Sequence, residues 1–228
     1  MFADTTILFS ATYTPDRFNE ESEIVFTELT RASVPVFVSV NVRAEFLENH
    51  RRVSIADCLV DFLNDAQADL DGPLLLKLQS HKKSHKQKSD EGKNTRLDVN
   101  QIKVFRSLLS GYSLGKRNGW QLLCQEYLKP QISSEWSNVE RELSLNFIST
   151  RSEDRSPMLA ELPQWERVVE LIGDYGIGSA DAMILNIFLC SKIPALLTAD
   201  MELAESAVTE AKGQKQIFVP DSLLASQM

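Results

Sequence analysis

Short apolar runs occur at several widely separated places along the chain. Residues 34–40, VPVFVSV, and residues 194–199, PALLTA, are continuous runs of this kind. Runs of this length are typical of strands that are buried on both faces of a sheet. Residues 142–150 alternate between apolar and polar side chains, and residues 215–220 form a last apolar segment. The pattern therefore predicts a strand in each of these four segments.

Helical spacing of apolar residues fills much of the sequence between the predicted strands. It predicts helices over residues 18–33, 156–176 and 178–189. Residues 41–66 are predicted to form two helical stretches, the second of which begins at Ser54 as an N-cap. Because strands alternate with helices, the fold class is α/β, with a mostly parallel central sheet covered by helices on both faces.

The middle of the chain differs from its flanks. Residues 80–94, SHKKSHKQKSDEGKN, are polar and lysine-rich without apolar periodicity, which predicts a mobile surface loop. Apolar periodicity then returns in segments that glycines break, and Pro130 is expected to end the last helix. The sequence therefore predicts a core formed by residues 1–66 and 142–228, with a largely helical insertion at residues 67–141.

The composition predicts a soluble globular protein. Of the 228 residues, 43% are hydrophobic, which is enough to fill a core. No apolar run approaches the ~20 residues of a membrane helix, and the N-terminus lacks the basic start of a signal peptide, so a cytoplasmic location is expected. The three cysteines are widely spaced and odd in number, which indicates reduced packing residues and no disulfide framework.

Charge is distributed unevenly. The net charge is −8, which argues against a general affinity for nucleic acid. Residues 77–96 nevertheless contain seven Lys and Arg and two acids, so this stretch carries 7 − 2 = +5 and the rest carries −8 − 5 = −13. We therefore expect this lysine run to attract RNA phosphates. The alternative is a flexible loop that has no role in RNA binding. Its candidate RNA-binding residues are Lys82, Lys83, Lys86 and Lys88.

Two aspartates stand at the openings of predicted helices. Asp200 directly follows the strand predicted at residues 194–199, and ligands of parallel sheets bind beyond the carboxyl ends of the strands. Asp181 lies in the first turn of the helix predicted at residues 178–189, from which it can point to the same place. Each aspartate can also act simply as a cap or as a partner of the helix dipole.

Four segments together resemble a known family. ADTTILFSA, VFVSVNVRAEF, GSADAMILNIF and LLTAD occur in the order of the motifs of the PIN domain. This is a family of metal-dependent ribonucleases that includes the toxins of bacterial toxin–antitoxin modules. The resemblance covers residues 1–66 and 142–220, and it implies a three-layer α/β/α fold. By this resemblance, the family's four acidic positions are Asp4, Glu45, Asp181 and Asp200.

The same resemblance places two hydroxyl residues beside the acids. Thr6 falls on the polar position two residues after the first acid, and Thr198 falls on the hydroxyl position that precedes the last acid. Taken singly, Asp4 could be an ordinary terminal residue and Glu45 could face water. Thr6 and Thr198 would hold a carboxylate or a water molecule in place.

Neighbouring carboxylates have a chemistry that agrees with this resemblance. Four carboxylates that lie close together repel one another, so either some of their pKa values rise or a cation neutralises them. Oxygen ligands favour Mg²⁺ or Mn²⁺, and such an ion can activate water for attack on a phosphodiester. The expected function is therefore that of a metal-dependent endoribonuclease, with a toxin of a toxin–antitoxin pair as one form.

The expected partners follow from this function. They are RNA, an inhibitory antitoxin protein and a second copy of the chain in a homodimer, and no membrane partner is expected. The alternative function is that of a catalytically silent PIN-like module that binds RNA or protein through its insertion. Metal binding and hydrolysis at the acids distinguish the two functions.

Other candidate residues have competing interpretations. Arg51 and Arg52 follow Glu45 closely and could hold the scissile strand, but pairing with nearby acids is the alternative. His81 and His85 are spaced like metal ligands on one helix face. They lie in the lysine run without a third ligand nearby, so we interpret them as part of a solvated, charged segment.

Two features depart from the family pattern. Local pattern alone predicts a strand over residues 5–11, TTILFSA, whereas the family requires a very short first strand that ends before Asp4. On the helix that follows the third acid, the family has a small residue that allows close packing. This chain has Asn186 and larger neighbours in that region.

Overall fold

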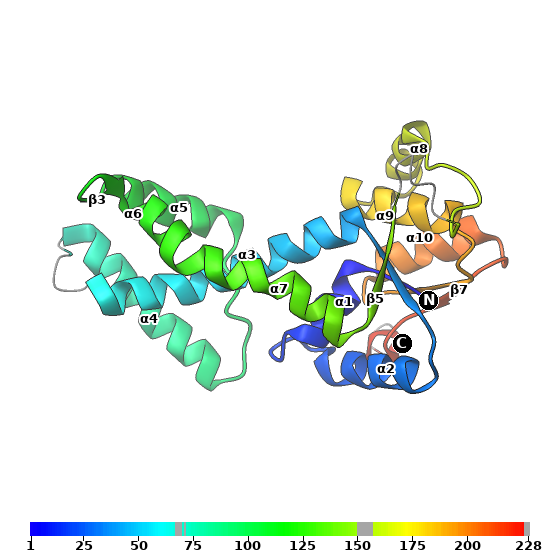
Figure 1. Ribbon diagram of the computed structural model, residues 1–228, viewed down its shortest axis with the longest axis horizontal. Helices are drawn as coiled ribbons and strands as arrows, with labels where there is room; N and C mark the ends of the chain where they lie inside the picture. The colour runs from blue at the N-terminus through cyan, green and yellow to red at the C-terminus, as the bar shows by residue number, and fades with distance from the viewer. Residues whose placement is uncertain (67–69, 71, 150–156, 226–228) are drawn as a thin grey trace. The chain divides into compact units, whose positions relative to one another are not determined.

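The computed structural model describes residues 1–66, 70, 72–149 and 157–225, and of Leu114 it describes the backbone. The chain forms two compact units (Figure 1). Unit 1 comprises Met1–Phe46 and Val139–Met228, and unit 2 comprises Leu47–Asn138. The insertion expected at residues 67–141 thus begins, in this division, within helix α3 and ends within helix α7. These two helices, which belong to both units, are α3 (Val40–Ala66) and α7 (Lys129–Glu142).

A five-stranded, all-parallel sheet forms the centre of unit 1, as the α/β prediction requires. Its strand order is β5-β2-β1-β6-β7. Phe2 of the central strand pairs with Phe37 on one side and with Leu196 on the other. The strands are β1 (Phe2–Ala3), β2 (Val36–Ser39), β5 (Leu145–Ile148), β6 (Ala195–Leu197) and β7 (Gln216–Phe218).

Helices cover both faces of this sheet. Helices α1 and α2 pack against each other, and α9 packs against both α8 and α10 (Figure 1). Since parallel crossovers are right-handed, the reversal of strand order at β1 and β6 sends their helices to opposite faces and opens a crevice at the carboxyl ends of these strands. The helices are α1 (Thr5–Thr12), α2 (Asn19–Arg31), α8 (Trp165–Tyr175), α9 (Ser179–Cys190), α10 (Met201–Ala211) and α11 (Asp221–Ala225).

The first strand is very short, so the strand that local pattern predicts over residues 5–11 is wrong. This segment is helix α1, which begins directly after the N-cap Asp4. Its side chains Ile7, Leu8 and Phe9 are all buried. A helix that is buried on nearly all sides has no amphipathic period, so its sequence cannot be told from that of a buried strand.

Residues 41–66 form one helix instead of two, so the N-cap role of Ser54 is wrong. Ser54 lies inside α3, which runs without a break from Val40 to Ala66. Of the residues after it, Ile55, Leu59 and Phe62 are fully buried. Because serine is tolerated in a helix interior at modest cost, packing along the whole helix outweighs this local stop signal.

The lysine-rich segment is helical, which corrects the expected mobile loop. It lies in α4 (Gly72–Asp90), a helix of 19 residues. Leu74 and Leu78 on this helix are buried in the core of unit 2 together with Phe62 and Phe105. The apolar residues that anchor the helix come early in it, so the lysine run itself carries little of the periodicity that predicts a helix.

The two histidines hold α4 against α3 within unit 2, so their interpretation as part of a solvated segment is also wrong. His81 Nε2 lies 2.9 Å from the Ala56 carbonyl oxygen, and His85 Nε2 lies 2.8 Å from Asp57 Oδ1. The His81 ring meets the edge of Phe105 at a centroid distance of 5.2 Å. These contacts show that the i, i+4 spacing serves helix packing.

The rest of unit 2 is a set of helices around a small hairpin. Strands β3 (Ser113–Leu114) and β4 (Arg117–Asn118) lie between helices α5 (Val99–Ser110) and α6 (Gly119–Leu122). The expectation that Pro130 ends a helix is wrong, because α6 continues through the π-helix η2 (Leu123–Leu128) into α7. The wider hydrogen-bond spacing of a π-turn relieves the clash that proline causes in a regular helix.

The helix expected over residues 156–176 is shorter, and residue 156 lies outside the described part. Helix α8 begins only at Trp165, and Gly176 ends it with a left-handed φ of 69°. The preceding residues pair with the end of α9 instead, since Leu159 forms a β-bridge with Ser191. Residue 150, the expected end of strand β5, is likewise not described. Within the described ranges, no helix has both the length and the apolar composition needed to cross a membrane.

Candidate active site

Asp4 is placed at the carboxyl end of the central strand β1, where it caps helix α1. Its Oδ2 atom accepts three hydrogen bonds: from Thr6 N at 3.2 Å, from Thr6 Oγ1 at 2.6 Å and from Thr198 Oγ1 at 2.9 Å. Thr198 follows strand β6, the neighbour of β1 in the sheet. Asp4 therefore joins the two strands on either side of the crevice.

The other oxygen of Asp4 has no partner. Asp4 is 1% exposed, and its Oδ1 atom is buried without a hydrogen bond to any described residue. Burying an unpaired carboxylate oxygen is unfavourable, because the water that it loses is not replaced. Burial accordingly raises the pKa of the Asp4 carboxyl, against the opposing effect of the hydrogen bonds from Thr6 and Thr198.

Thr6 and Thr198 form the framework around Asp4. Their Oγ1 atoms are 3.3 Å apart, and each accepts a backbone hydrogen bond, from Ala199 N at 3.0 Å to Thr6 and from Asp200 N at 3.0 Å to Thr198. Because each hydroxyl donates to Asp4 and accepts from the loop after β6, neither is free to rotate. Both threonines therefore hold Asp4 in place from behind its Oδ2 atom.

Asp200 closes the same loop and caps helix α10. Its Oδ1 accepts a hydrogen bond from Leu203 N at 3.0 Å. The capping role considered from the sequence is therefore correct for Asp200. This hydrogen bond uses one oxygen of the Asp200 carboxylate, whose charge also acts on Glu45 and Asp181.

Glu45 lies on the first turns of α3, the helix that follows strand β2. Its Oε2 accepts a hydrogen bond from Thr5 Oγ1 at 2.9 Å. Burial raises the pKa of Glu45, and the charges of Asp4 and Asp200 raise it further, although the bond from Thr5 acts in the opposite direction. Thr5, which sequence reasoning did not select, thus positions Glu45. Its only signal is its place between Asp4 and Thr6.

Asp181 lies in the first turn of α9, whose N-cap is Gly178. A Cβ atom added at Gly178 would lie 3.0 Å from Asp181 Oδ2, so the absence of a side chain there leaves room for the carboxylate. Burial, followed by the charges of Glu45, Asp4 and Asp200, raises the pKa of Asp181 to about 7. The charges of Asp4 and Asp200 act on both Glu45 and Asp181, so the structure brings the four sequence-predicted acids into one electrostatic group.

The four acids are neighbours, but they do not form a closed ligand shell. Within the part of the chain that the structure describes, no three His, Cys, Asp or Glu side chains have the spacing needed to hold a metal ion. Three carboxyl oxygens of the group already accept bonds, from Thr5 to Glu45, from Thr6 and Thr198 to Asp4, and from Leu203 to Asp200. Rotation of carboxyl groups would be needed to gather oxygens around a cation.

The candidate RNA-binding residues belong to unit 2, whereas the four acids belong to unit 1. Arg51 forms a bidentate ion pair with Glu48, with distances of 2.7 and 2.6 Å, and Arg52 Nε donates to the Leu97 carbonyl at 2.7 Å. The alternative of pairing within the protein is thus correct for Arg51, and Arg52 also has a partner. Lys82, Lys83 and Lys86 are exposed on α4, and Lys88 is partly buried.

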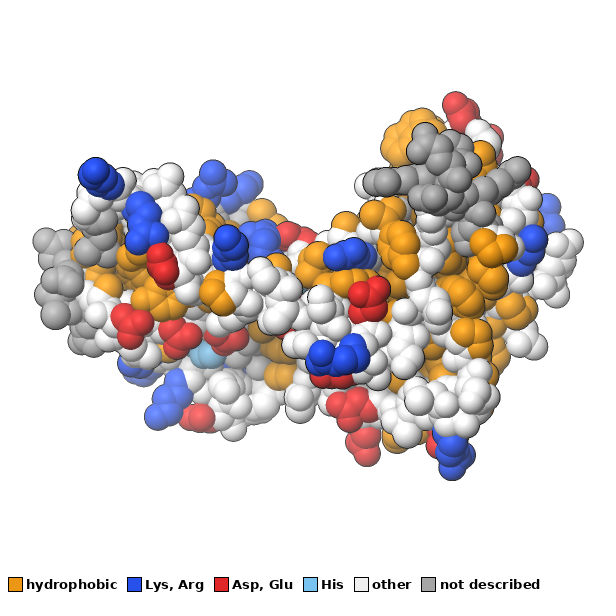
Figure 2. Space-filling model, viewed as in Figure 1, with side chains coloured by type: hydrophobic (Ala, Val, Ile, Leu, Met, Phe, Trp, Pro, Cys, Tyr) orange, Lys and Arg blue, Asp and Glu red, His pale blue; other side chains and the backbone are white. Residues whose placement is uncertain are grey.

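Basic and acidic side chains are interspersed on unit 2 in the view of Figure 2. Lys82 also bonds to Asn64 Oδ1 at 2.5 Å. The lysines at 82, 83, 86 and 88 are therefore presented as single side chains on a helix, and not on a mobile arm.

Comparisons with known proteins add no assignment. The sequence matches no protein-family model and no curated protein, and no solved structure matches the chain. The resemblance to the PIN domain therefore remains a prediction that rests on the four motifs and on the geometry of the acids.

Proposed function

We propose that this chain is a metal-dependent endoribonuclease with a PIN-like fold, and that Asp4, Glu45, Asp181 and Asp200 form its active site. The observation that carries the proposal is the buried, unpaired Oδ1 of Asp4 within a group of four interacting carboxyls. A protein retains such an unfavourable arrangement where binding or catalysis makes use of it. The position of the group at the switch point of a parallel sheet also supports the proposal.

The donor set fits a hard divalent cation. All four candidate ligands are carboxylates, and the nearest polar side chains are the hydroxyls of Thr5, Thr6 and Thr198. Oxygen ligands of this kind suit Mg²⁺ or Mn²⁺ better than zinc. When bound, such an ion would supply Lewis-acid activation of a phosphodiester and of the attacking water.

The chain's own residues have distinct roles in this site. Thr6 and Thr198 hold Asp4 through Oδ2 and leave Oδ1 as its available ligand atom. Thr5 orients Glu45 through Oε2. Asp181, with a pKa of about 7 in the metal-free site, is divided between acid and carboxylate near neutral pH, so binding of the ion would release its proton and leave a charged ligand.

RNA is the proposed substrate, and the exposed lysines of α4 are the groups proposed to attract it. Their attraction is electrostatic and independent of base sequence. By the resemblance to toxin ribonucleases, an antitoxin protein that inhibits cleavage is the corresponding protein partner. The competing function, a silent module that binds RNA without cleaving it, has the same lysines but needs no metal at the acids.

The proposal is tested by incubating the protein with single-stranded RNA of mixed sequence and Mg²⁺ or Mn²⁺. We expect cleavage that EDTA abolishes. Asp4→Asn should reduce kcat by at least about a hundredfold, because it removes a ligand charge that no neighbouring group replaces. The amide retains an oxygen that can accept from Thr6 and Thr198, so circular dichroism should show an intact fold.

Asp174→Asn is the matched control. Asp174 is an exposed acid on α8, and the same chemical change there should leave cleavage unaltered. Wild-type cleavage by Asp4→Asn, or cleavage that survives EDTA, would contradict the proposed mechanism. RNA binding without cleavage under every metal condition would favour the silent module.

A further inference from the structure

A cavity of about 300 Å³ lies in unit 1 between the start of α3, the start of α8 and the middle of α9. Trp165 stands at its rim with 60% of the residue exposed, which is unusual for a side chain of this size. A volume at the lower end of the range for ligand pockets suits one small ring system. The principal lining residues are Val40, Asn41, Pro163, Gln164, Trp165 and Met183.

The first turns of α3 carry residues of both this cavity and the acidic group. Asn41 lies four residues before Glu45 on α3, so the two side chains share one face of the helix. Met183 lies two residues after Asp181 on α9, and its Sδ atom is 3.3 Å from Asn41 Nδ2. This contact links α3 to α9 one turn before Glu45 on α3, whereas Met183 and Asp181 leave α9 in different directions. A strand whose phosphate reaches the acids would carry its next base to this cavity.

The lining selects for an uncharged, flat group. None of the lining residues in the described part of the chain carries a charge. Its apolar members are Val40, Pro163, Trp165, Val168, Met183 and Ile187, and the amides of Asn41, Gln164 and Asn186 add hydrogen-bonding edges. A phosphate would find no cation here, whereas a nucleobase offers a ring face to Trp165 and polar edges to the amides.

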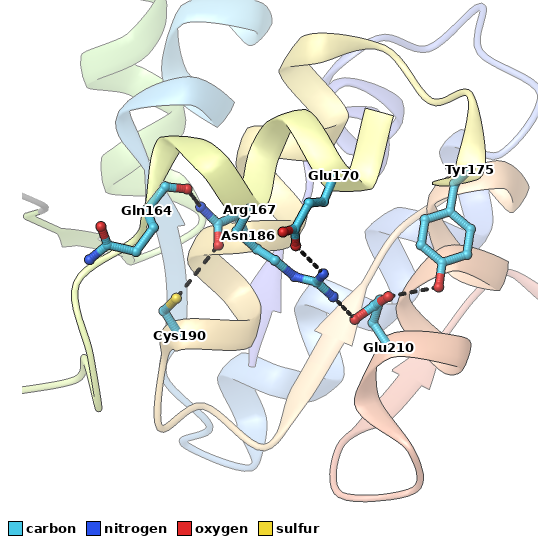
Figure 3. A network of polar contacts seen from close by, with 7 residues as sticks. All are labelled: Gln164, Arg167, Glu170, Tyr175, Asn186, Cys190 and Glu210. Atoms are coloured by element: carbon cyan, nitrogen blue, oxygen red, sulfur yellow. Dashed lines mark hydrogen bonds and ion pairs between the residues drawn. The ribbon is translucent and has the colours of Figure 1, made fainter. Parts of the chain in front are cut away.

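Polar contacts hold the start of α8, directly before Trp165, in position before a ligand arrives (Figure 3). Asn186, the residue that departs from the family pattern, donates from Nδ2 to the Gln164 carbonyl at 2.9 Å, directly before Trp165. Cys190 Sγ lies 3.6 Å from Asn186 Oδ1 on the same helix. The start of α8 is therefore fastened to α9.

The body of α8 is fastened to α10 by the second part of this network. Arg167 bridges Glu170, at 2.7 Å, and Glu210 on α10, and Tyr175 OH donates to Glu210 Oε1 at 2.7 Å (Figure 3). Because the helix that carries Trp165 is fixed, its backbone loses little freedom when a ring stacks on that side chain, which favours binding.

We propose that this cavity is a subsite for an unpaired nucleobase of the RNA strand, with Trp165 as its stacking platform. The inference rests on the proposed function, because it needs a phosphodiester at the neighbouring acids. It adds a feature that the acids cannot provide, since they contact phosphate and carry no preference for single strands. Stacking on Trp165 requires an unpaired base, so the site selects single-stranded RNA over duplex RNA.

The test compares two fluorescein-labelled oligonucleotides in Ca²⁺, which carboxylates also bind, and a gel after each titration confirms that the strands are intact. One is oligoadenylate and the other is an abasic ribose-phosphate strand of the same length. Fluorescence anisotropy should show that the wild-type protein binds oligoadenylate about tenfold more tightly than the abasic strand, in line with about 1.4 kcal/mol for one stacked base. Trp165→Ala should abolish that difference, and Trp165→Phe should retain most of it.

A second measurement places the base on this side chain. Oligoadenylate should quench the tryptophan fluorescence of the wild-type protein, and the quenching should be lost in Trp165→Phe although that variant still binds. Val169→Ala is the matched control, since Val169 is 54% exposed one turn further along α8 and does not line the cavity. This variant should behave like the wild type in both measurements.

The outcomes separate the subsite from the nuclease. Base-dependent binding that Trp165→Ala removes would support the subsite even if no RNA is cleaved, and only the catalytic proposal would then fail. Equal binding of both strands, or base-dependent binding that Trp165→Ala leaves unchanged, would overturn the subsite whether or not RNA is cleaved. In that case the cavity would be better suited to an apolar side chain of a protein partner.

Discussion

Asp181 is the residue at which the cost of gathering four acids can be measured directly. Its pKa is raised from 3.8 to about 7, which is a shift of about 3 units. At 1.36 kcal/mol per unit, the upper limit of the associated free energy is about 4 kcal/mol. Because Asp181 is only partly buried, screening by solvent reduces this figure, and we expect about 1–2 kcal/mol.

The direction of the effect follows from the pKa in the two states. Between pH 3.8 and about 7 the folded protein holds a proton on Asp181 that the unfolded chain has released. The free energy of unfolding therefore falls as pH rises through this window, and the penalty is complete above pH 7. Asp181→Asn cannot ionise, so the variant should escape the penalty.

The assay is urea denaturation in EDTA at pH 5 and pH 8. At pH 8, Asp181→Asn should be more stable than the wild type by about 1–2 kcal/mol. At pH 5, the gain should be smaller than at pH 8, because part of the wild-type carboxyl is still protonated in the folded state. Asp174→Asn, at an exposed position of α8, should show no such dependence on pH.

Divalent cations should reverse this order of stability. Mg²⁺ at a hundred times its dissociation constant would stabilise the wild type by about 2.7 kcal/mol and the variant by less, because the variant lacks a ligand charge. The wild type should then be the more stable protein at pH 8. A variant that is no more stable than the wild type in EDTA at pH 8 would refute the electrostatic account of Asp181.

Two further predictions concern the surroundings of the acids and the lysines. Gly178→Ala should cut metal-dependent kcat by about tenfold, because the added methyl group displaces the Asp181 carboxylate, and it should change the free energy of unfolding by less than about 1 kcal/mol. Gly173→Ala is the control, since the space around Gly173 is open, and it should leave kcat unchanged. Equal kcat values for the two variants would contradict this prediction. The quadruple change of Lys82, Lys83, Lys86 and Lys88 to Ala should weaken RNA binding several-fold and lower its salt slope by up to about 3, with kcat at saturation intact. Binding that is unchanged in a salt titration would mean that α4 only packs unit 2.

The fold class could be predicted because buried parallel strands leave a strong signal. The runs at residues 34–40 and 194–199 correspond to strands β2 and β6, and the helix predicted at residues 18–33 corresponds to α2. These segments have one dominant period each. The sheet order could not be read in the same way, because pairing of β1 with both β2 and β6 depends on contacts between residues far apart in the chain.

The errors occur where tertiary packing outweighs local pattern. Ser54 carries a cap signal, but the core of unit 2 keeps α3 helical through it. The lysine run has no apolar stripe of its own, yet Leu74 and Leu78 earlier in α4 anchor the helix, and His81 and His85 hold it against α3. Neither interaction is visible within a short window of sequence.

The site shows the same division between what sequence can and cannot reveal. The four acids could be named from motif order, since each follows a strand or opens a helix. Thr5 could not, because its role depends on where α3 lies. In the first turn of α1, successive side chains point in different directions, so Thr6 reaches Asp4 and the loop after β6 while Thr5 reaches Glu45 on α3. The sequence Asp-Thr-Thr thus connects three elements.

The hydrogen bonds of Thr6 and Thr198 also explain which oxygen of the acid group lacks a partner. Three donors converge on Asp4 Oδ2, and none reaches Oδ1. A fold selected only for stability would pair that oxygen or replace the aspartate, because an unpaired buried carboxylate costs free energy. A cation at Oδ1 would recover this cost and would lower the repulsion that raises the pKa values of Glu45 and Asp181. The instability of the metal-free site and its proposed affinity for a metal therefore have the same physical origin.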